Sequence, residues 1–140
     1  MRRFEVVDRS MTPTFEEGEY LIARRRPPRT GDVVVLEHPA RPGFHLIKRV
    51  VAGAGEEVAI EEGRLLVDGR PRDPLGDLYH LEPPGRWELG DDDCFVLSDN
   101  RSATFADSRS FGPVPTRGMW VVVVRYWPPG RVGTDFRPLA

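Results

Sequence analysis

Lysine is almost absent from this chain of 140 residues, although basic residues as a class are common. Of the 20 basic residues, 19 are arginine, and the one lysine is Lys48. Arginine stays protonated in a protein, whereas a desolvated lysine can lose its proton and act as a base. The isolated lysine is therefore a candidate for chemistry that needs a neutral amine. The alternative explanation is that codon bias favours arginine and that the one lysine has no special role.

The chain also has little cysteine, a small net charge and no long apolar run. The single cysteine, Cys94, excludes an internal disulfide and a multi-cysteine metal site. A net charge of −2 argues against nucleic-acid binding. The longest apolar run is residues 119–124, whereas a membrane span needs about 20. We therefore expect a soluble protein, cytoplasmic or peripheral to a membrane, without a leader peptide, metal or cofactor.

Turn-forming and β-branched residues are abundant, with 14 glycines, 14 prolines and 16 valines. This composition favours a mainly β fold, and no helical apolar period extends over a useful length. The sequence predicts one domain over residues 1–140, with residues 70–89 as an irregular surface excursion. The glycine residues at 63 and 69 indicate a hairpin turn at 61–63 and another turn at 68–69. Strands are expected at 4–7, 19–23, 33–36, 44–52, 58–60, 64–67, 95–97 and 118–127.

Ser10 and Lys48 are the candidates for nucleophilic chemistry. Ser10 follows the first expected strand, and a serine hydroxyl needs a base to become a nucleophile at neutral pH. None of the three histidines lies in a recognisable partner pattern. On a strand, Lys48 would share a face with the apolar Leu46 and Val50, and desolvation there would lower the pKa of its amine. A Ser–Lys pair is an established variant of the serine-protease triad.

Four blocks follow one another along the chain in a recognisable order. They are residues 10–14 (SMTPT), 31–35 (GDVVV), 47–50 (IKRV), and 98–101 (SDNR) followed by 107–112 (DSRSFG). Together they resemble the type I signal peptidases and the wider S26 family of serine proteases, over roughly residues 4–132. Each block alone is weak evidence for the family. All four blocks in this order, with the one lysine at the position of the general base, are strong evidence for it.

The resemblance implies a signal-peptidase-like catalytic fold of antiparallel sheets with little helix. It also implies a serine endopeptidase that removes an N-terminal signal or pro-peptide after a small residue, at a site resembling Ala-x-Ala. Ser10 would be the nucleophile and Lys48 the general base, with the Ser10 backbone N–H donating to the oxyanion. The partners would be an extended peptide or preprotein, bound as an added strand at a sheet edge.

The same resemblance implies supporting roles. Thr104 is favoured as the hydroxyl that orients Lys48, with Ser98 and Ser102 as alternatives. The small-residue pockets would be lined by Phe4, Val6, Met11 and Ile47. A polar scaffold behind the dyad would be formed by Asp99, Asn100, Arg101, Asp107 and Arg109.

Departures from the family pattern leave alternatives open. Asp8 stands where the family has serine or glycine, Ser98 replaces a glycine, and one extra residue precedes Asp107. These changes motivate a catalytically silent peptide-binding module on the same fold. Only nine residues precede Ser10, where the family carries membrane spans. The chain could be a domain without its anchor, or a dedicated soluble maturation protease for a cytosolic precursor, similar to the nickel-superoxide-dismutase maturation proteases. A third alternative is peripheral membrane contact through Phe111, Trp120, Tyr126 and Trp127.

Overall fold

The computed structural model describes residues 1–72, 80–126 and 137–138, which fold into antiparallel strands and one four-residue helix. A mainly β fold with little helix, as the sequence predicted, is thus confirmed. The strands of the first sheet are β1 (Arg2–Glu5), β2 (Tyr20–Arg25), β3 (Val33–His38), β4 (Arg41–Ala52), β9 (Asp93–Leu97), β10 (Val114–Pro115), β11 (Trp120–Tyr126) and β12 (Arg137–Pro138). Those of the second are β5 (Glu57–Glu61), β6 (Arg64–Val67), β7 (Arg70–Pro71) and β8 (Gly85–Glu88).

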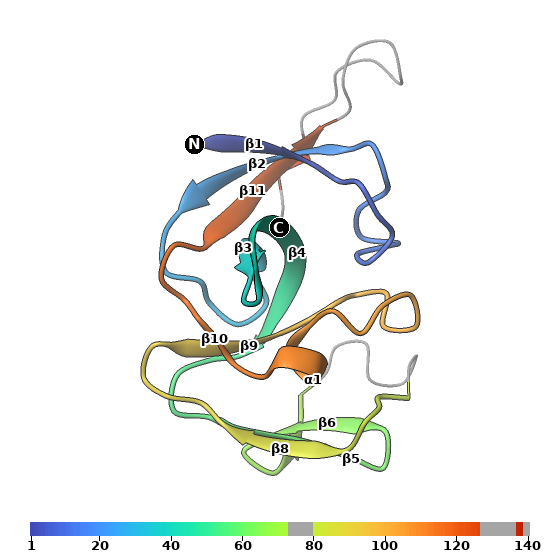
Figure 1. Ribbon diagram of the computed structural model, residues 1–140, viewed down its shortest axis with the longest axis vertical. Coiled ribbons are helices and arrows are strands. Elements are labelled where there is room, and N and C mark those ends of the chain that lie inside the picture. Colours follow the sequence, from blue (N-terminus) through green and yellow to red (C-terminus); the bar gives the residue numbers. More distant parts are fainter. Residues whose placement is uncertain (73–79, 127–136, 139–140) are drawn as a thin grey trace.

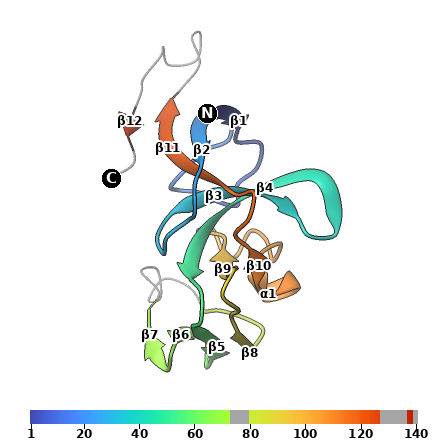
Figure 2. The same ribbon diagram turned by 90° about the vertical axis from the view of Figure 1, so that its left-hand side faces the viewer.

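The first sheet has the order β1-β2-β11-β3-β4-β9-β10, and β12 pairs with β11. Strand β4 begins at Arg41, earlier than the expected strand over 44–52, and pairs with β3 from Arg41 to Arg49. Its last residues, from Arg49 to Ala52, pair with β9, where Arg49 lies opposite Leu97. Figures 1 and 2 show β4 leaving the β3 hairpin and running down to the second sheet. The strand therefore connects the two sheets, and β1 forms one edge of the first.

The second sheet has the order β7-β6-β5-β8 and is built on two tight turns. Glu62 and Gly63 connect β5 to β6 with φ values of 51° and 78°. Asp68 and Gly69 connect β6 to β7 with φ values of 51° and 78°. A positive φ at both central residues is the signature of the type I′ hairpin turn, which matches the twist of the flanking strands. Both turns were predicted from the sequence.

The described residues of the segment over 70–89, expected to be an irregular surface excursion, contain two strands. These are β7 and β8, and β8 pairs with β5 so that Trp87 lies opposite Val58. Leu81 and Leu89 are buried in the core under the second sheet. Strand β8 was not predicted from the sequence because Trp87 is its one large apolar residue, so the strand shows no alternation of apolar and polar residues.

Three apolar clusters hold the described residues together. One lies under the second sheet, and one lies on the β4 face that carries Leu46 and Val50. The third lies on the opposite face, where Val6 and Met11 pack against residues of β2, β3 and β11. The short helix α1 (Ser108–Phe111) follows β9 in a region expected to be irregular, and Asp107 caps its N-terminus.

Candidate active site

Ser10 lies in a loop that is closed at its base by backbone hydrogen bonds. The N–H of Val6 donates to the carbonyl of Glu19 at 2.8 Å, and the N–H of Gly18 donates to the carbonyl of Val6 at 2.7 Å. Inside this loop Ser10 is 6% exposed, and the peptide bond before Pro13 is cis. The loop thus keeps Ser10 packed against the rest of the domain, in a defined backbone conformation.

The loop is bound to the segment that follows β9. The Asn100 N–H donates to the carbonyl of Ser10 at 2.9 Å, and its side-chain amide donates to the carbonyl of Arg9 and to Thr12 Oγ1. Thr14 Oγ1 donates to Asp99 Oδ2 at 2.6 Å. Two sequence blocks separated by almost ninety positions are therefore brought together, with Asn100 fixing the backbone of Ser10 itself.

Lys48 is almost completely buried on β4, with an exposed fraction of 1%. It lies opposite Val34 and on the β4 face that also carries Leu46 and Val50, as strand alternation predicted. Burial lowers the pKa of Lys48 below its ordinary value, and Arg109 acts in the same direction, whereas Asp107 and Asp8 act against it. The surroundings therefore destabilise the charged ammonium relative to its state in water, because a charge in an apolar environment loses its hydration.

The side-chain nitrogen of Lys48 has a hydroxyl partner. Lys48 Nζ donates to Ser98 Oγ at 2.9 Å, whereas Thr104 Oγ1 accepts from the N–H of Ala106 at 3.0 Å. Within the described part of the chain, no hydrogen bond joins Lys48 Nζ to Ser10 Oγ or to Thr104. Of the three hydroxyl groups considered from the sequence, Ser98 is the one that contacts the lysine.

A buried ion pair stands behind Ser98. Asp107, fully buried, accepts from the Ser98 N–H at 3.0 Å and from Arg109 Nη2 at 2.8 Å. Arg109 Nη2 also donates to the carbonyl of Thr104, and Arg101 Nε donates to the carbonyl of Ser98 at 2.9 Å. These residues hold the backbone on both sides of Ser98, and so fix the position of the hydroxyl that Lys48 contacts.

Asp8 occupies the expected oxyanion donor. Its Oδ1 accepts from the backbone N–H of Ser10 at 2.9 Å, although the Asp8 side chain is exposed. The sequence identified Asp8 as a departure from the family pattern but did not place it on this N–H group. The Asp8 carboxylate therefore lies where the oxyanion would have to be in order to accept from the Ser10 N–H.

Four residues were expected to line substrate pockets, and they lie around the third apolar cluster. Val6 and Met11 are buried in it, with Met11 Sδ accepting from the Asp99 N–H at 3.4 Å. Phe4 and Ile47 are half-buried and pack against it. Phe4 on β1 and Ile47 on β4 therefore each keep part of the side chain exposed.

Two contributors to the site were not found from the sequence. Arg49 donates to Asp99 from Nε at 2.9 Å and from Nη2 at 2.8 Å, and Thr14 completes the set around this buried carboxylate. One feature of the sequence pointed to Arg49. Because side chains alternate along a strand, Arg49 was expected on the face of β4 opposite to that of Lys48. The partner of Arg49 is 50 positions away, which local sequence patterns do not reveal.

The described aromatic residues considered for membrane contact are buried or half-buried. Tyr126 is buried, Phe111 and Trp120 are half-buried, and Trp127 lies outside the described residues. Among the described residues, no helix is long and apolar enough to cross a membrane. In the same part of the chain, no group of three His, Cys, Asp or Glu side chains could hold a metal ion.

Comparison with known proteins relates this geometry to a family. The model for signal peptidase, peptidase S26, matches residues 1–127. The chain is 36% identical to signal peptidase I of Leptolyngbya laminosa, over 89% of this chain and 68% of that protein. It is 33% identical to the probable thylakoidal processing peptidase 2 of Arabidopsis thaliana, over 88% of this chain and 37% of that protein.

A solved structure confirms the fold. The crystal structure of a signal peptidase I from Enterococcus faecalis superimposes with a TM-score of 0.58 at 20% identity, covering 71% of this chain and 99% of that one. Since the family model covers nearly all of the chain and a relative exceeds one third identity, the chain belongs to the signal peptidases of the peptidase S26 family.

Proposed function

We propose that this protein is a serine endopeptidase in which Ser10 is the nucleophile and Lys48 the general base, and that it removes an N-terminal signal or pro-peptide. The observation that carries the proposal is the burial of the chain's one lysine beside the loop of Ser10. An amine with a lowered pKa can accept a proton near neutral pH, which an exposed lysine does poorly.

The proposed acylation uses Ser10 and Lys48 together. Neutral Lys48 Nζ takes the proton of Ser10 Oγ while Oγ forms a bond to the scissile carbonyl carbon. The resulting oxyanion is stabilised by the Ser10 N–H once Asp8 has left it. The C–N bond then breaks, and the Lys48 ammonium gives its proton to the departing amine. Water releases the acyl group by the same route, with its proton taken by Lys48 and one returned to Ser10 Oγ.

The geometry required of Lys48 is partly in place before substrate binds. Ser98 Oγ already holds Nζ, and Ser10 Oγ has to come within hydrogen-bond distance when peptide enters, as is common for catalytic contacts that tighten in the complex. We therefore assign the orientation of Lys48 to Ser98 rather than Thr104. Ser98→Ala should lower kcat about fivefold, which corresponds to about 1 kcal/mol for one hydrogen bond. A larger loss in Thr104→Ala than in Ser98→Ala would reverse this assignment.

Specificity for small residues is proposed from the crowding near Ser10. Val6 and Met11 are buried, and Phe4 and Ile47 restrict the remaining space, so side chains about the size of alanine fit best at the first and third positions before the cut. A peptide in extended conformation could pair with the edge strand β1 while presenting alternate side chains to these pockets.

The test is cleavage of peptides that contain an Ala-x-Ala site, followed by mass spectrometry. The wild type should cut after the second alanine, and Ser10→Ala should not. Lys48→Arg should also be inactive, because arginine keeps the charge but cannot become a neutral base. Thr30→Ala removes a hydroxyl from an exposed loop and serves as the matched control. Turnover retained in Lys48→Arg would remove Lys48 as the base.

One observation favours a second candidate, a silent peptide-binding module. The Asp8 carboxylate on the Ser10 N–H would oppose oxyanion formation if it stayed there when peptide binds. Such a module would bind an extended peptide and leave it whole. Binding of an Ala-x-Ala peptide to the wild type without any cleavage over a day would support this second candidate.

A further inference from the structure

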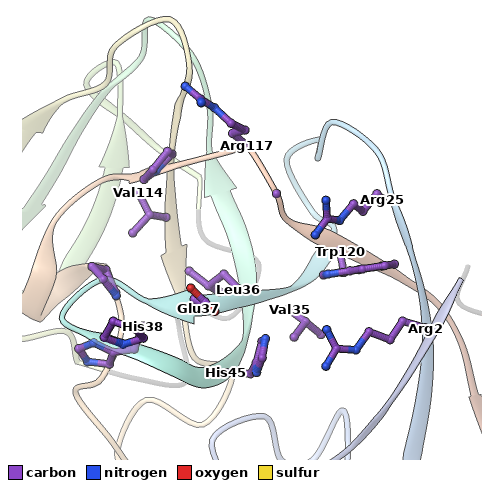
Figure 3. Close-up of a pocket in the computed structure, with 14 residues that line it drawn as sticks. Arg2, Arg25, Val35, Leu36, Glu37, His38, His45, Val114, Arg117 and Trp120 are labelled. Atoms are coloured by element: carbon purple, nitrogen blue, oxygen red, sulfur yellow. The ribbon is translucent and has the colours of Figure 1, made fainter.

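A cavity of about 600 Å³ lies next to Phe4, whose ring contacts two of its lining residues, His45 and Trp120. We call it the arginine pocket, after Arg2 on β1, Arg25 at the end of β2 and Arg117 in the turn before β11, which line it together with Trp120. Figure 3 shows Arg2 and Arg25 on either side of Trp120, with Arg117 farther from Trp120, on the segment that leads into β11.

The pocket is positively charged, and its charges are not neutralised within the described part of the chain. Arg2 and Arg25 place their guanidinium carbons 6.0 Å and 4.9 Å from the Trp120 ring, and no described carboxylate forms a salt bridge with them or with Arg117. Glu37 is the single carboxylate among the described lining residues. Three fixed cations against one anion leave an excess that suits an anionic ligand.

The pocket continues the path that we propose for substrate. The Phe4 ring is 6.0 Å from Trp120 and 5.8 Å from His45, and both of these residues line the pocket. Phe4 is also one of the proposed small-residue pocket residues. A peptide that runs from Ser10 along β1 therefore passes Phe4 and reaches Arg2. Eight chain positions separate Arg2 from Ser10. A fully extended peptide rises about 3.3 Å per residue, so it reaches Arg2 at most about eight residues before the scissile bond.

We propose that the arginine pocket binds acidic side chains of the precursor, about five to eight residues upstream of the cut; this inference rests on the proposed function. Arginine side chains that converge on a hollow suit the carboxylates of a narrow extended chain, which they can bind bidentately. A membrane surface is flat, and the aromatic side chain here, Trp120, is half-buried and lies between Arg2 and Arg25.

The consequence concerns the class of substrate. A secretory signal carries an apolar stretch of about 7–15 residues before its cleavage site. Such a stretch would bring apolar side chains to Arg2, Arg25 and Arg117, which would have to lose hydration without gaining a partner. A precursor with glutamate or aspartate at these positions matches the pocket instead, so the pocket selects an acidic pro-peptide over an ordinary apolar signal.

The experiment measures peptide binding apart from cleavage. Fluorescein-labelled peptides share one Ala-x-Ala site and differ in the four residues located five to eight positions upstream, which are all Glu, all Gln or all Leu. Anisotropy gives Kd for each peptide on Ser10→Ala, and mass spectrometry gives kcat/KM on the wild type. Vesicles containing phosphatidylglycerol are tested in parallel by sedimentation.

The Glu peptide should bind about five- to tenfold more tightly than the Gln peptide at low ionic strength, since partly exposed ion pairs are individually weak but three act together. High salt should reduce this ratio. Arg25→Gln with Arg117→Gln, in the Ser10→Ala background, should bring the ratio close to one. Arg64→Gln with Arg70→Gln removes the same charge from exposed positions of the second sheet and should leave it intact. Glu37→Gln should increase it.

Three results would overturn the proposal: equal binding of the Glu and Gln peptides, a ratio that survives loss of Arg25 and Arg117, or vesicle binding that needs these arginines while peptides show no preference. Failure of the proposed function looks different. A Glu preference in binding without cleavage of any peptide would leave the pocket assignment standing and reject the peptidase mechanism. Cleavage without a Glu preference would do the reverse.

Discussion

Removal of the Asp8 carboxylate should increase peptidase activity. The Ser10 N–H donates to Asp8 Oδ1 at 2.9 Å, so that bond must break before the N–H can stabilise an oxyanion. A hydrogen bond to a charged group contributes about 1.5–3 kcal/mol when it is shielded. Because Asp8 is exposed and water competes for its carboxylate, we take about 1 kcal/mol. Asp8→Ala should therefore raise kcat/KM about fivefold.

The same change should move the pH profile. Asp8 raises the pKa of Lys48, against the larger lowering by burial. Without this anion, the neutral amine persists to lower pH, so the acidic limb of the kcat/KM profile should shift to lower pH. Asp8→Asn separates the effects, since its amide oxygen still accepts from the Ser10 N–H while the charge is gone. It should shift the profile with a smaller gain in rate.

The assay is kcat/KM for an Ala-x-Ala peptide between pH 6 and 10. Asp91→Ala is the control, because it removes the same charge from an exposed position before β9, at the opposite end of that strand from Ser98. A fall in activity in Asp8→Ala would refute the reasoning, since it would mean that Asp8 helps to form the active geometry. An unchanged acidic limb in both Asp8 variants would separate Asp8 from the titration of Lys48.

Three further predictions concern buried groups. Lys48→Met should stabilise the fold near neutral pH, because a lysine of lowered pKa binds its proton more weakly when folded. In urea titrations at several pH values, this advantage should shrink as the pH rises from the folded pKa of Lys48 to the higher unfolded pKa, and it should be gone above the latter. Asp107→Asn should lower the free energy of unfolding by about 3–5 kcal/mol, because it leaves the buried Arg109 guanidinium without its counter-ion. Glu57→Gln removes one partner of an exposed ion pair and should lower it by less than about 1 kcal/mol. Equal losses in the two variants would contradict this prediction. Burial raises the pKa of Cys94 to about 12, so the native thiol should react with a disulfide reagent only after denaturation; fast native labelling would contradict this.

The parts of the fold and site that could be predicted are those that local patterns encode. Strand β3 follows from a run of β-branched residues, and the burial of Lys48 follows from alternation along β4. Strand β8 could not be predicted in this way, because its pairing with β5 depends on backbone hydrogen bonds around a single Trp87.

The contacts within the site depend on the register between distant strands. Ser98 meets Lys48 because β9 pairs with β4 from Arg49 onward, which places Ser98, directly after β9, beside a residue 50 positions away. The sequence favoured Thr104 for this contact from the family pattern, where an extra residue before Asp107 makes the alignment ambiguous. The capture of the Ser10 N–H by Asp8 likewise depends on the loop conformation, although the two residues are only two positions apart.

The scarcity of lysine makes amine acylation a probe of this site. Reagents such as succinimidyl esters modify neutral amines, and the chain offers them one ε-amine, which is 1% exposed. Apart from the α-amino group, acylation at neutral pH therefore requires the first sheet to open around β4. The rate of labelling at residue 48 then reports the frequency of that opening, in the way that amide hydrogen exchange reports local unfolding. A bound peptide that closes the site should slow it.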